Sequence, residues 1–501
     1  MRTTKMIKNF ITDFFPQIII MIIALFKSKI MLQYLGQETL GLYQLFAQVI
    51  TYLALAEGGL ASAAVYRLYK PIADKDNQKI AEIANATRNV FMIVSGIILV
   101  LGIGISFVVP FLIENNTFSY GYIISNFILY VISEVVVYLT IYRRALFEAN
   151  QEKYKINIIY QTSLILHSLL EIAILMLGGN LTSLFIMFIC LNTVTSMIIL
   201  LYGKKTYSYL PKTKKADYSL VKDVKNLFIH KISALISNNV DVIIISKVLG
   251  LVNVVIYTTY NYIINSLKLV VDKLYGAALG GIGNVLATDK DTGKKLFFEY
   301  NSLVFFFALV LGIPLLYAID YFIDIWYSNE IYTSMLLSIL FVVNLVYYII
   351  RTPLISFTTA AGLFKETNKC AILEVIINLS LSLILVNIIG IPGVLIGTIV
   401  SLVISEYMIK PIIIYKKVFG EGVKEYYLRN LKFVLYLIIG FVLIYVLKLH
   451  YRPINIIQWF FSSVIIGVVN LGLVTGYFIL VKELLFKDRV MNLIHLRKKE
   501  G

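Results

Sequence analysis

One face of the predicted eighth membrane span carries a stripe of polar side chains. Tyr257, Asn261, Asn265, Lys268 and Asp272 follow one another at intervals of three or four residues, which places them on one face of an α-helix. Amide and hydroxyl groups at this spacing suit the hydroxyl groups of a sugar. Hydrogen bonds between neighbouring membrane helices are the alternative explanation of such a stripe.

A smaller polar face lies in the predicted second span, at a related place in the first half of the chain. It consists of Gln44, Gln48, Thr51, Gly58 and Ser62. Thr51 falls opposite Asn265 when the two halves of the sequence are aligned. Because two polar faces recur at related places, the pattern favours a polar cavity over contacts between helices.

Basic side chains within the spans are the second candidate for chemistry. An ionised group at the centre of a bilayer costs at least about 2.5–3.5 kcal/mol and usually faces a cavity or a partner. The basic residues that carry a functional prediction are Lys27, Arg67, Lys231, Lys268 and Arg351. Arginine binds phosphate oxygens through two N–H groups at once, so Arg67 and Arg351 suit a phosphate. The alternative is that the lysines extend to the lipid headgroups and that Arg67 belongs to an ordinary basic collar.

Acidic residues within the spans give a third set. Asp241 has a short side chain and lies away from the ends of the predicted seventh span. We expect it either to pair with a cation, with Lys27 at its repeat-equivalent position, or to bind H⁺ or Na⁺, and we favour the pair. His167 is expected to be a hydrogen-bonded polar residue rather than a proton relay. Four other acids are expected to neutralise neighbouring cations: Glu57, Glu134, Glu374 and Glu406.

The composition indicates which elements position these side chains. Of the 501 residues, 59% are hydrophobic and only 15% are charged, whereas a soluble domain averages about 25% charged residues. This excludes a soluble enzyme, a secreted disulfide scaffold and a disordered regulator. Windows of roughly 20 apolar residues predict about fourteen transmembrane helices. The Gly276–Gly280, Gly393–Gly397 and Gly472–Gly476 pairs have the spacing of close helix contacts.

The distribution of Lys and Arg predicts the orientation. The net charge is +16, and with a cytoplasmic N-terminus the predicted outer loops hold only Lys448 and Arg452. Basic residues accumulate on the cytoplasmic side, so both termini are expected to be cytoplasmic. No nucleotide-binding loop, metal-ligand cluster or nucleophile–base pair is evident, so neither catalysis nor a cofactor is expected. Nucleic acid is not an expected partner.

An internal repeat divides the chain. Matches at a shift of 214 residues are Leu35-Gly36 with Leu249-Gly250 and Tyr43 with Tyr257, and matches at 212 residues are Ala149 with Ala361 and Gly178 with Gly390. Six spans per repeat give parallel repeats, with a binding site expected near mid-membrane between the halves. The predicted divisions are an N-terminal six-helix lobe (1–210), a cytoplasmic basic linker (211–225), a C-terminal six-helix lobe (226–420), and two additional helices with a basic cytoplasmic tail (421–501).

Two segments resemble a known family. LGQETLGLYQLFAQVITYLALAEGGLASAAVYRLYKPIADKD (35–76) and GLFKETNKCAILEVIINLSLSLILVNIIGIPGVLIGTIVS (362–401) are similar to parts of the bacterial polysaccharide flippases. These transporters carry undecaprenyl-diphosphate-linked O-antigen or capsule repeat units and belong to the multidrug/oligosaccharidyl-lipid/polysaccharide exporter superfamily. The resemblance implies two six-helix lobes around a V-shaped cavity that opens alternately to each side of the bacterial cytoplasmic membrane.

The residues and the resemblance together predict a flippase rather than an enzyme. The expected cargo is an undecaprenyl-diphosphate-linked oligosaccharide, and the other expected partners are membrane lipid, H⁺ or Na⁺, and a polysaccharide polymerase, with the chain acting as a monomer. The alternatives are a flippase for the cell-wall precursor lipid and a cation-coupled multidrug exporter on the same fold. Asp241 is the candidate for ion coupling. The candidate substrate-binding residues are Lys27, Arg67, Lys231, Lys268, Arg351, Gln44, Gln48, Asn261 and Asn265.

Overall fold

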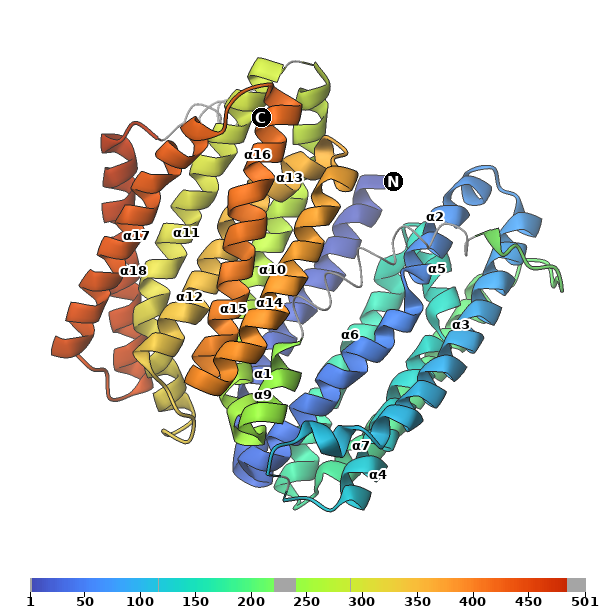
Figure 1. Ribbon diagram of the computed structural model, residues 1–501. Helices are drawn as coiled ribbons and strands as arrows, with labels where there is room; N and C mark the ends of the chain where they lie inside the picture. The colour runs from blue at the N-terminus through green and yellow to red at the C-terminus, as the bar shows by residue number, and fades with distance from the viewer. Residues whose placement is uncertain (1, 116, 220–239, 289, 484–501) are drawn as a thin grey trace. The chain divides into compact units, whose positions relative to one another are not determined.

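Helices account for all the regular structure in the described part of the chain. The computed structural model describes residues 2–115, 117–219, 240–288 and 290–483, and no β-strand occurs among them (Figure 1). Eleven segments of these residues are long and apolar enough to cross a membrane. The chain is therefore an all-α polytopic membrane protein, as the composition predicts.

Two further segments raise the number of spans among the described residues above eleven. The first candidate segment, Lys8–Leu53, contains two helices that meet at a kink at Gly36. Helix α10 (Leu251–Thr288) is 38 residues long and adds another span. The predicted seventh span, 226–249, lies partly outside the described residues, and only its end is seen as α9 (Asp241–Leu249).

The contacts within the chain define two compact units, Met1–Val255 and Ile256–Gly501. We call them unit 1 and unit 2. The helices of unit 1 are α1 (Arg2–Leu53), α2 (Leu60–Ala73), α3 (Asn77–Ser106), α4 (Tyr120–Tyr138), α5 (Ile141–Ala149), α6 (Lys153–Met176), α7 (Leu181–Thr206) and α9, with the first residues of α10.

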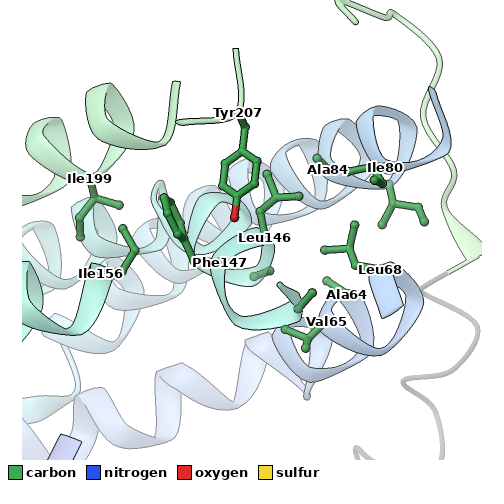
Figure 2. Packing of buried hydrophobic residues seen from close by; sticks show 13 residues of the cluster. Ala64, Val65, Leu68, Ile80, Ala84, Leu146, Phe147, Ile156, Ile199 and Tyr207 are labelled. Atoms are coloured by element: carbon green, nitrogen blue, oxygen red, sulfur yellow. The ribbon is translucent and has the colours of Figure 1, made fainter. Parts of the chain in front are cut away.

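Side-chain caps fix where several helices of unit 1 begin. The Asp76 side chain accepts from the Lys79 N–H at the start of α3, and Ser119 does the same for Tyr122 at the start of α4. Such caps satisfy N–H groups that have no partner within the helix. At the end of unit 1 that is predicted to be cytoplasmic, α2, α3, α5, α6 and α7 meet in one hydrophobic cluster (Figure 2).

Residues 241–255 belong to unit 1 by their contacts. The Glu114 N–H donates to the Ser246 carbonyl (3.0 Å), and the Ser246 hydroxyl donates to the Leu112 carbonyl (2.8 Å). Gly41 lies so close to the first turn of α10 that a Cβ atom there would be 2.3 Å from the Leu251 carbonyl oxygen. Only glycine fits this approach of two backbones.

The linker that follows α7 is held along α3. The Asn85 side chain donates to the carbonyls of Thr213 (3.3 Å) and Lys215 (3.1 Å). Lys79 pairs with Asp217 at 2.9 Å, and its hydrogen bond lowers the pKa of Asp217 to about 2. Residues 213–218 therefore form an ordered segment on the surface of unit 1.

Unit 2 contains the rest of α10 and the helices after it. These are α11 (Lys290–Trp326), α12 (Met335–Ile350), α13 (Thr352–Ala360), α14 (Phe364–Ile389), α15 (Ile391–Leu402), a π-helix (Val403–Ile409), α16 (Lys410–Ile414), a second π-helix (Tyr415–Phe419), α17 (Lys424–His450) and α18 (Ile456–Leu480).

The two additional helices, α17 and α18, are attached to α11 of unit 2 by buried polar contacts. Lys448 pairs with Asp320 at 2.6 Å. Near the other ends of these helices, the Ser302 hydroxyl of α11 donates to Glu483 Oε2 (2.7 Å), and the same carboxylate accepts hydrogen bonds from Arg429 and Lys432 of α17. Both ends of the helix pair are thus fixed to the bundle.

The backbone reproduces the internal repeat. Gly36 has φ 76° and ψ 169°, and Gly250 has φ 82° and ψ 176°, a conformation that is essentially restricted to glycine. Gly178 and Gly390 likewise both have positive φ, 84° and 69°. A nine-residue helix follows α4 in the first repeat and α12 in the second, as α5 and as α13. These matches confirm the glycine pairings predicted from the sequence.

Of the three predicted glycine contacts, one is confirmed, one is wrong, and the Gly276–Gly280 pair has surroundings that lie outside those described. A Cβ atom at Gly393 would be 2.4 Å from the Leu385 backbone, and one at Gly397 would be 2.5 Å from the Ser382 hydroxyl, so α14 and α15 pack closely there. At Gly472 and Gly476, by contrast, a Cβ atom would meet no described atom within 4 Å. Spacing alone does not reveal whether a small residue faces a helix or the lipid.

Candidate functional site

A polar cavity lies inside unit 1, among α1, α4, α6 and α7. Its volume is about 300 Å³. Most of the interior of a helix bundle is filled by apolar side chains, whereas this cavity exposes carboxylate, imidazole, amide and hydroxyl groups. The ionisable residues that line it include Lys27, Tyr43, Tyr130, Glu134, His167 and Glu171.

An ion pair joins α1 to α6 at this cavity. The Lys27 ammonium lies 3.1 Å from Glu171 Oε1, and the two side chains are 18% and 3% exposed. Glu171 Oε2 is buried and has no hydrogen-bond partner in the described chain. Glu171 rather than Asp241 is thus the ion-pair partner of Lys27, and the expectation that Asp241 pairs with a cation stays a prediction. The positive charge of Lys27 is neutralised at its own position.

Glu134 brings a second carboxylate to the cavity from α4. Among the described residues it has no hydrogen-bond or ion-pair partner, so the expectation that it neutralises a cation is wrong. His167 Nε2 is 2.9 Å from Asn192 Oδ1, and the Asn192 amide in turn donates to the Ser133 carbonyl at 2.9 Å. The expectation that His167 is a hydrogen-bonded polar residue is thus confirmed.

Aromatic rings support the cavity on its other side. Tyr130 stacks on Phe185 with ring centroids 4.9 Å apart, and Tyr43 stacks on Phe185 at 6.1 Å. Phe185 is fully buried. Phe185 thus packs α7 against α4 and α1 beside the cavity.

A cationic cluster lies in unit 2, on α10, α12 and the start of α13. The Lys268 ammonium donates to Asn344 Oδ1 (3.1 Å) and lies 5.0 Å from the centre of the Tyr348 ring. The Arg351 guanidinium stacks on the same ring at 4.6 Å. The Tyr348 hydroxyl donates to Asp272 Oδ1 at 2.5 Å. The Tyr348 side chain thus contacts two cations through its ring and one carboxylate through its hydroxyl.

Arg351 is the least satisfied member of this cluster. It has no ion-pair partner within the described chain, and its Nε is buried there without a hydrogen-bond partner. A stacked guanidinium keeps its N–H groups in the ring plane, where they can bind an oxyanion through two hydrogen bonds. We call Lys268, Tyr348 and Arg351 the unit 2 cluster.

The polar stripe on α10 is divided by the structure. Tyr257 packs against Phe341 of α12 with ring centroids 5.5 Å apart, and Lys268 and Asp272 also contact α12. These three members follow the interhelical alternative. Asn261 is half-buried and Asn265 is exposed, so their proposed contact with a sugar stays a prediction.

The other predicted substrate residues are scattered along unit 1. Gln44 and Gln48 lie one turn apart in α1, and Gln48 Nε2 is buried without a hydrogen-bond partner in the described chain. Arg67 is half-buried in α2, and Asp241 is buried at the start of α9. Lys231 lies outside the described residues.

Sequence reasoning missed the residues that hold the predicted cations. The sequence-based expectations include no role for Glu171, Tyr348 or Asn344. The available signal was that an intramembrane lysine needs a compensating carboxylate, which restricts the choice to a few acids. For Glu406 that reasoning holds, since it pairs with Lys410 one turn later.

Comparisons with known proteins identify the fold. No protein-family model matches the chain, and no curated protein matches it. Among solved structures, the lipid II flippase MurJ in an inward closed conformation aligns with a TM-score of 0.65 and 16% sequence identity, over 95% of this chain and 98% of that chain. An inward-facing multidrug resistance MATE family transporter of the MOP superfamily aligns with a TM-score of 0.58 and 14% identity, over 77% of this chain and 92% of the other.

A third structure is a MOP superfamily transporter from Pyrococcus furiosus, described as having a binding pocket of reverse polarity that suggests a different function. It aligns with a TM-score of 0.51 and 14% identity, over 81% of this chain and 92% of that chain. The chain therefore has the fold of the multidrug/oligosaccharidyl-lipid/polysaccharide exporter superfamily. At these identities the likeness establishes the fold alone.

Proposed function

On the premise of this fold, we propose that the protein is a flippase for undecaprenyl-diphosphate-linked oligosaccharides, working by alternating access. It moves the lipid-linked repeat unit from the inner to the outer face of a bacterial cytoplasmic membrane, in which it is a multi-pass protein with both termini in the cytoplasm. The fold supports a transporter rather than an enzyme. The composition and the one-sided distribution of Lys and Arg support the orientation.

The observation that carries the choice of cargo is the unit 2 cluster. Arg351 has no compensating acid in the described chain, and Lys268 lies on the same tyrosine ring. An unneutralised guanidinium near the inner end of a membrane helix is costly unless an anion binds to it. A diphosphate supplies oxygens for Arg351, which binds them through its fork of N–H groups, while the positive charge of Lys268 on the same ring adds electrostatic attraction.

The remaining predicted residues keep secondary places in this proposal. Lys27 is removed from the binding set, because Glu171 neutralises it inside unit 1. Arg67 and Lys231 stay as proposed contacts of the headgroup, and Gln44, Gln48, Asn261 and Asn265 as proposed contacts of the glycan. The divisions at 1–210, 211–225, 226–420 and 421–501 stay as the proposed lobes, linker and additional helices.

The membrane potential supplies a driving force for this direction of transport. Moving one negative charge out of a cell with a negative interior gains about 2.3 kcal/mol per 100 mV. A headgroup with about two negative charges is therefore driven outward without a coupled ion. If the transport is coupled to H⁺ or Na⁺, the free carboxylate Glu134 in the unit 1 cavity is the better-placed site, and Asp241 the earlier candidate.

The experiment that tests the cargo uses proteoliposomes with an imposed potential. A polyprenyl-diphosphate-linked disaccharide is placed in the leaflet that corresponds to the cytoplasmic face of the membrane. Its arrival in the opposite leaflet is followed with a membrane-impermeant enzyme that modifies the sugar. Lys268→Gln/Arg351→Gln is expected to lower the rate at least about tenfold, since two charge-assisted contacts are lost. Lys417→Gln, which removes an exposed cation from unit 2, is the matched control and is expected to leave the rate unchanged.

The same assay separates the alternatives. Faster transport of a lipid that bears the cell-wall precursor headgroup identifies the precursor flippase instead. Transport of a cationic dye that requires Glu134 but not Arg351 identifies the cation-coupled exporter. An unchanged rate in Lys268→Gln/Arg351→Gln with correctly folded protein overturns the role of the unit 2 cluster. Contact with a polysaccharide polymerase and a monomeric state remain proposals for affinity capture and for sizing in nanodiscs.

A further inference from the structure

Two adjacent arginines in unit 1 have the properties of a binding site that the proposed transport does not use. Arg143 and Arg144 lie in the first turn of α5, and both are half-buried. Neither has an ion-pair partner within the described chain, and Arg143 Nε is buried there without a hydrogen-bond partner. Two partly desolvated guanidinium groups on consecutive residues, without an ion-pair partner in the described chain, favour the binding of an anion.

The surrounding structure holds both side chains in place. The helix α5 is anchored by the residues that follow the arginines, of which Leu146 and Phe147 are fully buried in the hydrophobic cluster of unit 1 (Figure 2). The stem of Arg143 lies on α7 where Gly203 leaves room for it, because a Cβ atom at Gly203 would be 2.9 Å from Arg143 Cδ. The anchoring reduces the entropy that is lost when a ligand binds.

Aromatic rings orient the two guanidinium groups. Arg143 lies 5.0 Å from the centre of the Tyr142 ring, and Arg144 lies 4.6 Å from that of Tyr160. A guanidinium over a ring keeps its hydrogen-bond donors at its edge, and arginine binds phosphate oxygens through two of them at once. The same association of arginine with tyrosine occurs at the repeat-equivalent junction in unit 2, where Arg351 lies over Tyr348.

The depth of the pair in the membrane points to a lipid-borne ligand. Helix α4 begins at Tyr120, and at 1.5 Å per residue Arg143 lies about 35 Å further along the chain. The hydrocarbon core is about 30 Å thick. The arginines therefore lie at the level of the headgroups on the side that is predicted to be cytoplasmic.

We infer that Arg143 and Arg144 form a binding site for the phosphate of an anionic membrane lipid. The site uses other residues than the unit 2 cluster and does not depend on which cargo is transported. A basic collar that only sets the topology would leave its side chains exposed in water, as Lys70 and Arg88 are. The buried Arg143 Nε distinguishes this pair from such a collar.

The test measures equilibrium binding to the full-length protein in nanodiscs of zwitterionic lipid. The background is Lys268→Gln/Arg351→Gln, so that the unit 2 cluster does not contribute. The probes are labelled farnesyl diphosphate, phosphatidylglycerol and inorganic pyrophosphate, each compared with empty nanodiscs. Arg143→Gln/Arg144→Gln is expected to weaken lipid binding at least about tenfold, since charge-assisted hydrogen bonds are lost. Lys70→Gln/Arg88→Gln, which removes two exposed cations from unit 1, is expected to change it less than about twofold.

Two further variants address folding and geometry. Arg143→Lys/Arg144→Lys keeps both charges but loses the planar fork, so binding is expected to weaken severalfold. Gly203→Ala displaces the Arg143 stem without removing a charge and is expected to weaken binding as well. Thermal unfolding of each variant shows whether it is folded.

The outcomes discriminate between ligand sources. Preference for farnesyl diphosphate identifies an isoprenyl diphosphate as the ligand, and preference for phosphatidylglycerol identifies bulk anionic lipid; both support the site. Pyrophosphate binding as strong as that of either lipid overturns the assignment to a lipid. If Arg143→Gln/Arg144→Gln and Lys70→Gln/Arg88→Gln weaken lipid binding equally, or if neither weakens it, the site itself is overturned.

Discussion

Units 1 and 2 share a backbone plan but pack equivalent helices differently. At the shift of 212 residues, Leu181 and Phe185 of α7 correspond to Gly393 and Gly397 of α15. The glycines let α15 approach the backbone of α14 closely, whereas in unit 1 the buried Phe185 stacks on Tyr130 of α4, and a cavity of about 300 Å³ lies among α1, α4, α6 and α7. The same two positions thus hold glycines at a close helix contact in unit 2 and large apolar side chains beside a polar cavity in unit 1.

The two units also differ in how the positive charges within their spans are neutralised. In unit 1, the intramembrane cation Lys27 is neutralised by Glu171 within the bundle. In unit 2, Arg351 remains without an acid in the described chain. The comparison indicates that a binding role should be assigned to a lysine or arginine within a span only when no neighbouring acid neutralises it. The predictions below test this difference, from the largest expected effect to the smallest.

The largest effect is expected from breaking the buried ion pair. Glu171→Gln leaves the Lys27 ammonium uncompensated, which destabilises by about 3–5 kcal/mol, whereas Lys27→Met/Glu171→Leu recovers most of the loss. Thermal unfolding of the detergent-solubilised protein measures both. Asp13→Asn, which breaks the exposed pair with Lys153 (3.8 Å), serves as the control and costs at most about 1 kcal/mol. A melting temperature of Lys27→Met/Glu171→Leu no higher than that of Glu171→Gln would contradict the pairing.

A methyl group at Gly393 is expected to have the next largest effect. Its carbon would lie 2.4 Å from the Leu385 backbone, which cannot move away as a flexible side chain can. The cost is expected at the upper end of the about 1–3 kcal/mol that is typical of overpacking. Gly467→Ala, where no described atom lies within 4 Å, is the matched control. Equal melting temperatures for the two variants would show that α14 and α15 are not packed at this distance.

The shared kink tests the similarity of the repeats. Gly36→Ala and Gly250→Ala each place a side chain in a conformation restricted to glycine, at a cost of about 1–3 kcal/mol. A Cβ atom meets no described atom at Gly36 and makes only an ordinary 3.5 Å contact at Gly250, so the two losses are expected to be equal. Thermal unfolding of both variants measures them. A loss at one position only would break the repeat relation.

The smallest effect is expected at the linker, a feature of unit 1. Lys79 lowers the pKa of Asp217 to about 2, from an ordinary value of about 3.9. A depressed folded-state pKa means that the stabilisation is present above about pH 4 and is lost as the pH falls towards 2. Hydrogen-exchange protection of the Asp217 N–H, which donates to the Glu82 carbonyl, should fall in this window.

Asp217→Asn should remove this pH dependence, at a cost of at most about 1 kcal/mol. Asp74→Asn, at an exposed position at the same end of unit 1, should leave the dependence unchanged. A pH profile that is identical in the wild type and in Asp217→Asn would exclude Asp217 as its source.

The sequence predicted those features that local chemistry determines. Apolar windows are set by the thickness of the bilayer, and the glycines at 36 and 250 are required by their backbone angles. The partner of Lys27 could not be predicted, since Glu171 is 144 residues away and periodicity gives the face of a helix but not its neighbour. The same limit applies to Gly472 and Gly476, because a lipid-facing glycine and a packed one have the same spacing.

The attachment of residues 241–255 to unit 1 has a consequence for dividing the chain into two polypeptides. A fragment that stops at the linker loses the partners of the Glu114 N–H and the Leu112 carbonyl, and it uncovers the backbone beside Gly41. Co-expressed halves cut there would each expose hydrogen-bonding groups without partners until they reassociate. The second half therefore brings with it the piece that completes the first.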